Sequence, residues 1–230
     1  MMKSVLNINC SALLFDMDGV LIHSTLAVAR VWKQWALERG FDPDAVAAMA
    51  QGRPSLTTVR ELLPNSDHLA ENREVERREM EDLDGVIAAP GSRQLLARLP
   101  DHLWALVTSS TKPLTEVRLR AAGLPLPKLL ITSNDIVHGK PHPEPFIKGA
   151  ALVGFSPQQC IVIEDTPAGI RAGKAAGARV LALRTTMPDS ELRAASPDWV
   201  TDDCSFLQVN DVSPERGISL LVAEQLAIGN

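Results

Sequence analysis

Six short, nearly continuous apolar runs in this chain alternate with helical patterns from about residue 90 to about residue 200. Strands covered on both faces are apolar throughout, so these runs are typical of a parallel sheet. We predict strands at Ala12–Asp16, Trp104–Ser109, Lys128–Thr132, Cys160–Asp165, Arg179–Arg184 and Trp199–Thr201. We predict helices at Ser92–Leu99, Thr115–Ala122, Pro145–Val153 and Gly169–Ala176. The alternation indicates a doubly wound α/β fold with a Rossmann-like parallel-sheet core.

Residues 24–86 do not follow this alternation and are expected to be all helical. Ser24 is a suitable N-cap for a helix that ends at Gly40, and further helices are predicted at Pro43–Ala50, Ser55–Leu63 and Ser66–Asp82. The last carries a run of mixed charges, which indicates a solvated face with local ion pairs. We therefore expect a core made of residues 1–23 and 87–230, with a small helical cap at 24–86 that could close over the first strand. The residues after Phe206 support no prediction.

Composition narrows the function only slightly. The chain has 230 residues, a formal net charge of −5 and no stripe of lysine and arginine, so nucleic acid is not an expected partner. The three cysteines are widely spaced, which suits a reducing compartment. No signal peptide or membrane span is apparent. We expect a cytoplasmic monomer or weak dimer without a membrane partner.

The first predicted strand ends in the most informative motif of the chain, Asp16-Met-Asp18-Gly19. Side chains alternate along a strand, so Asp16 and Asp18 leave the backbone on the same side. Two adjacent carboxylates repel one another unless a cation or a proton intervenes. Such a pair suits a nucleophile beside an acid/base group over Mg²⁺. An ordinary turn is the alternative reading; a calcium loop is disfavoured because apolar residues follow Gly19.

Other polar residues follow the predicted strands, where ligands of such sheets gather. Hydroxyls at Thr108-Ser-Ser-Thr111 could cradle a phosphate or merely cap a helix. Two acids, Glu164 and Asp165, follow an apolar strand and would be costly there without a cation or donors. Lys140 lies between Gly139 and a proline; it is either solvated or the counter-charge for these acids.

Together the Asp-x-Asp-Gly motif, the strand-end Ser/Thr, the Lys-Pro loop and the Glu-Asp pair occur in the order of the haloacid dehalogenase-like phosphatases. The chain resembles their subgroup with a helical cap after the first motif, which includes β-phosphoglucomutase and small sugar or polyol phosphatases. The resemblance extends from about residue 11 to about residue 186. It departs at the hinge, where His23-Ser24 replaces the usual Asp-Ser.

The resemblance implies a role for each matching residue. Asp16 attacks phosphorus, Asp18 serves as acid and then base, and Lys140 offsets negative charge. Mg²⁺ is held by Asp16, the Asp18 carbonyl and Asp165, whereas Glu164 acts through water or orients its neighbours. The phosphoryl oxygens are bound by Ser109 and the Ser110 N–H, with Thr108 as a possible helper.

We therefore expect a Mg²⁺-dependent phosphomonoesterase that hydrolyses a small phosphorylated sugar or polyol through an aspartyl-phosphate. In the cap, Arg53 could read the substrate or could be an ordinary solvated arginine. A phosphosugar mutase is one alternative, but Val28 occupies the position of a histidine that assists the β-phosphoglucomutases this chain resembles. A non-catalytic phosphoester-binding module is the other alternative.

Overall fold

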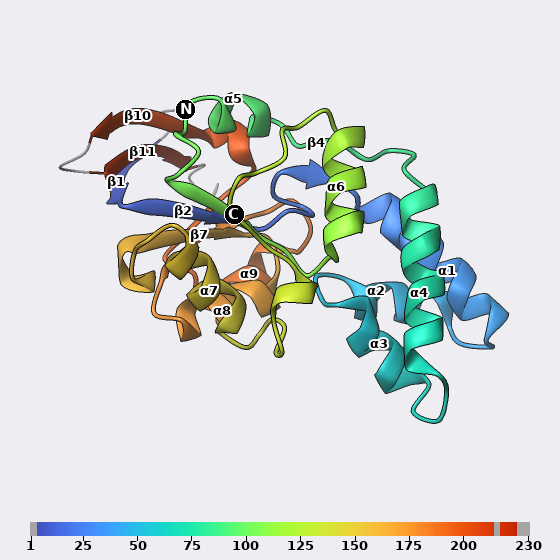
Figure 1. Ribbon diagram of the computed structural model, residues 1–230. Helices are drawn as coiled ribbons and strands as arrows, with labels where there is room; N and C mark the ends of the chain where they lie inside the picture. The colour runs from blue at the N-terminus through green and yellow to red at the C-terminus, as the bar shows by residue number, and fades with distance from the viewer. Residues whose placement is uncertain (1–3, 214–216, 225–230) are drawn as a thin grey trace.

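The computed structural model describes residues 4–213 and 217–224, and its centre is a six-stranded parallel sheet. The strand order is β6-β5-β2-β7-β8-β9 (Figure 1). Its strands are β2 (Ala12–Phe15), β5 (Trp104–Val107), β6 (Leu130–Ile131), β7 (Cys160–Glu164), β8 (Arg179–Leu183) and β9 (Trp199–Thr201). All six predicted strands and the doubly wound fold are confirmed. Because the order reverses between β2 and β7, a ligand crevice is expected at their carboxyl ends.

Helices cover both faces of this sheet. Leu13 and Phe15 of β2 pack with the face under α5 and α6, whereas Ala12 and Leu14 pack with the face under α7, α8 and α9. These helices are α5 (Ser92–Leu96), α6 (Lys112–Ala121), α7 (Glu144–Leu152), α8 (Pro167–Ala175) and α9 (Asp189–Ala194). Helix α9 was not predicted from the sequence. The predicted start of α6 was three residues late, because a proline at the first or second helical position does not break a helix.

A second sheet, also missed, lies against the first face. It is antiparallel with the order β1-β11-β10, formed by β1 (Ser4–Cys10), β10 (Leu207–Ser213) and β11 (Gly217–Glu224). Ser4 pairs with Glu224, so the sheet joins the two ends of the described chain. Buried Ile218, Leu220 and Val222 of β11 extend the main core. The described residues after Phe206, 207–213 and 217–224, therefore contribute to the fold.

Four helices form the cap, which lies to one side of the core in Figure 1. They are α1 (Thr25–Glu38), α2 (Pro43–Ala50), α3 (Ser55–Leu62) and α4 (His68–Glu81). Trp32 and Trp35 are fully buried in a separate apolar cluster. Two short antiparallel strands, β3 (Ile22–His23) and β4 (Ile87–Ala88), connect the cap to the core. The helical insertion is confirmed; its proposed limits at 24 and 86 stay a prediction.

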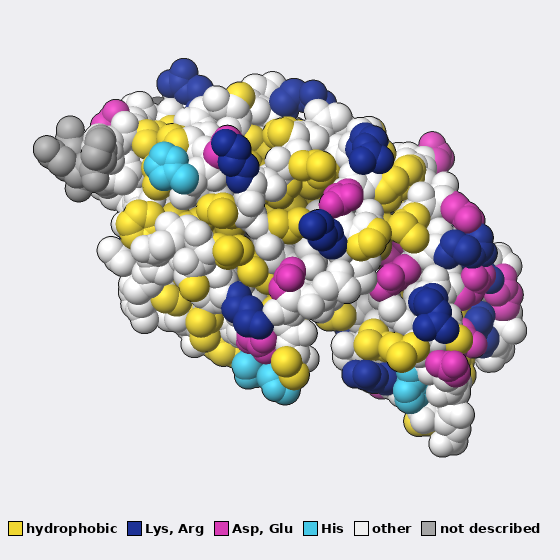
Figure 2. Space-filling view, viewed as in Figure 1, with side chains coloured by type: hydrophobic (Ala, Val, Ile, Leu, Met, Phe, Trp, Pro, Cys, Tyr) yellow, Lys and Arg dark blue, Asp and Glu magenta, His cyan; other side chains and the backbone are white. Residues whose placement is uncertain are grey.

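The charges of α4 agree with the sequence analysis except at one residue. Arg77 pairs with Glu74 and Glu81 along the helix, and basic and acidic side chains are interleaved over the cap in Figure 2. Glu79, however, is only 5% exposed. The prediction of a solvated face was wrong there because α4 packs beside α6 of the core. Among the described residues, no helix is long and apolar enough to cross a membrane.

Candidate active site

Asp16, Lys140 and Glu164 meet at the carboxyl ends of β2 and β7 and are all buried. Lys140 Nζ lies 2.5 Å from Asp16 Oδ1 and 2.6 Å from Glu164 Oε1. The alternative of a solvated Lys140 is therefore wrong. A buried ammonium between two carboxylates compensates charge that would otherwise be costly to bury.

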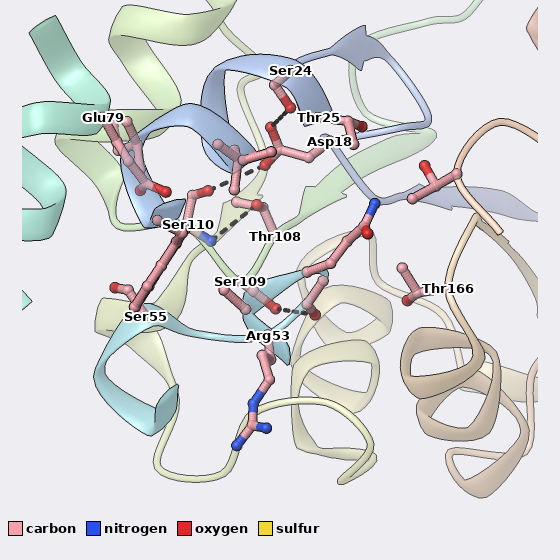
Figure 3. Close-up of a pocket in the computed structure, with 18 of the residues that line it drawn as sticks. Asp18, Ser24, Thr25, Arg53, Ser55, Glu79, Thr108, Ser109, Ser110 and Thr166 are labelled. Atoms are coloured by element: carbon pink, nitrogen blue, oxygen red, sulfur yellow. Dashed lines mark hydrogen bonds between the residues drawn. The ribbon is translucent and has the colours of Figure 1, made fainter. Parts of the chain in front are cut away.

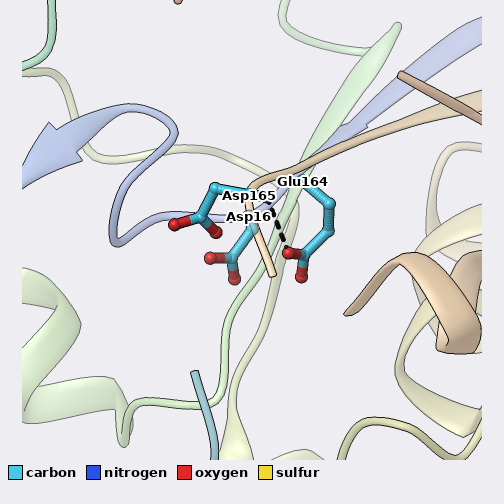
Figure 4. Close-up of side chains that lie close together, drawn as sticks. All are labelled: Asp16, Glu164 and Asp165. Atoms are coloured by element: carbon cyan, nitrogen blue, oxygen red, sulfur yellow. Dashed lines mark hydrogen bonds between the residues drawn. The ribbon is translucent and has the colours of Figure 1, made fainter. Parts of the chain in front are cut away.

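Asp165 completes an acidic cluster with Asp16 and Glu164 (Figure 4). One ligand oxygen of each residue lies within 4.8 Å of those of the other two. Asp165 Oδ1 is buried and has no hydrogen-bond partner. An orphaned carboxylate oxygen beside a second carboxylate fits a hard divalent cation such as Mg²⁺.

Gly19 makes room for Asp165. Its φ is +81°, a conformation that L side chains rarely adopt, and a Cβ placed there would lie 1.8 Å from Asp165 Oδ2. The same Cβ would meet the buried hydroxyl of Thr186 at 2.5 Å. Gly19 therefore allows both the turn of the backbone and the close approach of Asp165, the residue that follows β7.

Glu164 is held by donors on both oxygens. Oε1 accepts from Lys140, and Oε2 accepts from the backbone N–H groups of Asp165 and Thr166 and from the Thr166 hydroxyl. A Cβ at Gly169 would lie 1.7 Å from Oε1, so the helix that follows β7 can approach only with glycine at this position. These contacts favour an orienting role for Glu164 over direct metal binding.

The environment shifts the proton affinities of this cluster. Burial raises the pKa of Asp16 to about 7, against the opposing attraction of Lys140. Burial, with the neighbouring Glu164 and Asp16, raises the pKa of Asp165 well above its ordinary value. Burial lowers the pKa of Lys140, but Asp16 and Glu164 more than offset this and the net pKa is raised. These raised carboxyl pKa values show that negative charge is costly in the cluster, which is the environment in which a cation can replace protons.

Asp18 faces a different set of partners, two of which, Ser24 and Ser110, are labelled in Figure 3. Its carboxylate accepts from the Ser24 hydroxyl, from Ser110 Oγ at 3.2 Å and from Arg118 Nη1 at 3.2 Å. Ser24 occupies the N-cap position of α1, but its side chain makes no cap hydrogen bond there. The hydroxyl predicted to cap the helix instead connects the hinge to Asp18.

The predicted phosphate-binding residues lie together beside Asp18 at the start of α6 (Figure 3). Ser110 N–H donates to Thr108 Oγ1 at 3.1 Å, and Ser109 Oγ donates to the Gly52 carbonyl of the cap at 3.4 Å. Both donors are thus engaged within the protein, and the second contact is long. Thr108 therefore holds the backbone N–H of Ser110, and its predicted help in binding the phosphoryl oxygens stays a prediction.

A cavity of about 180 Å³ lies between this site and the cap. Asp16, Asp18 and Asp165 line it from the core, and Val28 lines it from α1. Arg53 also lines the cavity, but its guanidinium points away from Asp18 in Figure 3 and pairs with Glu61 at 2.7 Å.

Three residues of this site, Arg118, Glu79 and Thr186, were not predicted from the sequence. Arg118 of α6 is 3% exposed and bridges Asp18 and Glu79, whose Oε1 lies 3.6 Å from Arg118 Nη2. Burial raises the pKa of Glu79 to about 7, against Arg118. The third is Thr186, which lines the cavity just after β8. Of the three, only Thr186 could have been recognised from the sequence, because its hydroxyl follows a predicted strand.

Comparisons with known proteins agree with this geometry. The family model for haloacid dehalogenase-like hydrolase matches residues 10–177. Hexitol phosphatase A of Escherichia coli is 38% identical over 76% of this chain and 83% of its own length. Glycerol-1-phosphate phosphohydrolase 2 of Saccharomyces cerevisiae is 31% identical over 91% of this chain and 89% of its own length.

A solved structure supports the fold independently. β-Phosphoglucomutase from Clostridium difficile superimposes with a TM-score of 0.75 at 21% identity, over 86% of this chain and 93% of its own. Together the matches confirm the predicted family and its enzyme class, a phosphatase. The chain belongs to the haloacid dehalogenase-like hydrolases.

Proposed function

We propose that this protein is a Mg²⁺-dependent phosphomonoesterase that hydrolyses a small phosphorylated sugar or polyol through an aspartyl-phosphate on Asp16. The strongest support is the buried contact between Asp16 and Lys140 beside the unpartnered oxygen of Asp165. A dianionic substrate can approach an anionic nucleophile only where cations compensate the charge. Lys140 supplies one such cation, and the acidic cluster offers a place for another.

The proposed reaction has two steps. The Asp16 carboxylate attacks phosphorus, and the ester bond breaks as Asp18 gives its proton to the leaving alkoxide. Water then attacks the aspartyl-phosphate and loses a proton to Asp18, which releases inorganic phosphate and restores Asp16. Ser109 and Ser110 would bind the phosphoryl oxygens once their present internal contacts are exchanged for substrate.

Mg²⁺ would be held by Asp16, Asp165 and the backbone carbonyl of Asp18. When bound, it supplies a Lewis acid that stabilises charge on the transferring phosphoryl group. Because both oxygens of Glu164 already accept hydrogen bonds, Glu164 would hold Lys140 and the backbone after β7 and would not bind the ion. Lys140 offsets the remaining charge on Asp16 and on the phosphoryl group.

The substrate class is inferred from the relatives and the cavity. Two relatives are named for hexitol and glycerol 1-phosphate substrates, and the cavity of about 180 Å³ suits a small leaving group. Arg53 lines the cap side of this cavity, where its guanidinium could donate to a substrate hydroxyl while Glu61 balances the charge of Arg53. Val28 lines the same cavity and can neither donate nor accept a proton, which favours a phosphatase over a mutase.

The test is phosphate release from a hexitol phosphate and from glycerol 1-phosphate, with Mg²⁺ and with excess chelator. We expect turnover that needs Mg²⁺. A protein that binds these esters without releasing phosphate would be the non-catalytic module instead. A cytoplasmic location and a monomeric or weakly dimeric state remain predictions, which fractionation and sedimentation would check.

A further inference from the structure

A buried carboxylate of the cap faces the acid/base residue across a single guanidinium. Arg118 Nη1 contacts both oxygens of Asp18 at 3.2 Å, and its Nη2 lies 3.6 Å from Glu79 Oε1. Glu79 is 5% exposed and lines the cavity. One cation is thus shared by two carboxylates that belong to different parts of the molecule.

Glu79 has acceptor capacity to spare. The 3.6 Å separation from Arg118 is an ion pair but is longer than a hydrogen bond. A carboxylate offers about four acceptor positions. The Trp32 side chain also donates a hydrogen bond to Glu79. These two partners leave acceptor positions of the buried carboxylate open, and hydroxyl donors on a ligand in the cavity would fill them.

The position of Glu79 fixes which part of a substrate it would meet. In the proposed reaction, Asp18 protonates the ester oxygen, so that oxygen must lie beside Asp18. Atoms of the leaving group beyond it extend into the cavity, where Arg118 and Glu79 line the wall between core and cap. Glu79 would then face the hydroxyls of the leaving group and not the phosphate.

The charges that line the cavity oppose a second anion. Among its lining residues, all within the described part of the chain, the two cations are Arg53 and Arg118, and each already pairs with a carboxylate. Glu76 and Glu79 line the cap side. A leaving group that carries a carboxylate or a second phosphate would therefore meet acids and no unpaired cation.

We propose that Glu79 accepts hydrogen bonds from the leaving-group hydroxyls and makes the site select neutral polyhydroxy phosphates over phosphates with a second negative charge. This inference rests on the proposed phosphatase function. Arg118 acts as a positioning residue that holds Glu79 and Asp18 on either side of one guanidinium. If the contact of Glu79 between α4 and α6 were purely structural, replacing Glu79 would instead reduce activity on all substrates alike.

The test uses the full chain with Mg²⁺ at pH 8 and three substrates. Glycerol 1-phosphate and 3-phosphoglycerate share a carbon skeleton but differ by a terminal hydroxyl against a carboxylate, and acetyl phosphate has no hydroxyl. The wild-type kcat/KM should favour glycerol 1-phosphate over 3-phosphoglycerate by about a hundredfold or more. A wild-type preference for 3-phosphoglycerate would overturn the inference without any variant.

The variant Glu79→Gln keeps the shape of the side chain but removes its charge. A lost charge-assisted hydrogen bond corresponds to roughly a tenfold or greater effect. We expect the ratio of kcat/KM for glycerol 1-phosphate to that for acetyl phosphate to fall about tenfold, mainly through KM. The ratio for 3-phosphoglycerate to acetyl phosphate should rise. Glu81→Gln, an exposed residue of the same helix that pairs with Arg77, is the matched control and should leave both ratios unchanged.

Equal losses on all three substrates in Glu79→Gln would assign the residue a structural role and overturn the proposal. If Glu79→Gln does not fold, the wild-type preference and Glu79→Asp, which retains the charge at a shorter reach, decide the question by the same two ratios. Failure of the wild type on every substrate, acetyl phosphate included, would instead contradict the proposed phosphatase itself.

Discussion

Lys140 Nζ lies 2.5 Å from Asp16 Oδ1, and both side chains are at least nine-tenths buried. The contact joins a loop before α7 to the end of β2 across 124 residues of sequence. Its consequence is that charge compensation and nucleophile position depend on the same side chain. A change at Lys140 should therefore alter stability and chemistry together.

We expect Lys140→Met to abolish measurable phosphatase turnover and to reduce the free energy of unfolding by about 3–5 kcal/mol, because two buried carboxylates lose their cation. Adding Glu164→Gln should recover part of the stability but no activity. Denaturant titration and phosphate release measure the two effects. Lys128→Met is the control, since its pair with Asp101 is exposed and worth under about 1 kcal/mol. Activity retained in Lys140→Met would contradict the role proposed for this residue.

Mg²⁺ should stabilise the protein more at pH 8 than at pH 5. The pKa of Asp16 rises to about 7 on folding, from roughly 3.9 in an unfolded chain, and that of Asp165 is also raised. Between about pH 4 and pH 7 the folded state keeps protons that the unfolded state has lost, so the stability of the metal-free protein falls as the pH rises. A metal that replaces these protons gains affinity over the same range.

Thermal unfolding with Mg²⁺ and with chelator, at both pH values, checks this expectation. Asp165→Asn should remove most of the difference, whereas Asp101→Asn, an exposed acid far along the chain from the cluster, should not. An equal Mg²⁺ shift of Tm at pH 5 and pH 8 would be inconsistent with a cation in this cluster.

The main sheet and the motifs at its strand ends were the parts of the structure that the sequence predicted best. The six strands of the main sheet were predictable because burial on both faces leaves nearly continuous apolar runs, as in Cys160–Glu164. The motifs at their ends were predictable because parallel strands bring such residues to one edge. The antiparallel sheet was not, because β1 and β10 mix polar and apolar residues and because β1 pairs with β11 over more than 200 positions, as Asn7 does with Leu221.

Residues that depend on contacts between elements were also missed. Glu79 belongs to a run of mixed charges in which its neighbours Arg77 and Arg78 do form local pairs. Its burial follows from the packing of α4 beside α6, which no local pattern encodes. Arg118, in the middle of an otherwise ordinary helix, gave no signal either.

Arg53→Ala should lower kcat/KM for the sugar or polyol phosphate about tenfold, and for p-nitrophenyl phosphate much less. The proposed reason is the loss of a charge-assisted hydrogen bond to a leaving-group hydroxyl, typically worth about 1.5–3 kcal/mol. Arg60→Ala, an exposed arginine on α3, serves as control. If both substrates lose activity equally, Arg53 lies outside the specificity pocket.

The enzyme should release phosphate from sugar phosphates and should not convert β-glucose 1-phosphate into glucose 6-phosphate. A mutase must protect its aspartyl-phosphate from water until a second hydroxyl arrives, and Val28 offers no proton-transferring group at the cavity wall. Assays of both products with the bisphosphate activator present distinguish the reactions. Efficient isomerisation with little free phosphate would favour the mutase.

The central claim is that Asp16 carries the phosphoryl group, and trapping that intermediate tests it most directly. Borohydride reduces an aspartyl-phosphate to homoserine, which peptide mass spectrometry can locate. In Asp18→Asn with acetyl phosphate, the good leaving group needs little acid while the attacking water lacks its base, so the intermediate should accumulate. We predict homoserine at position 16 in Asp18→Asn, and neither homoserine nor turnover in Asp16→Asn. Wild-type turnover by Asp16→Asn with normal metal content would contradict the account.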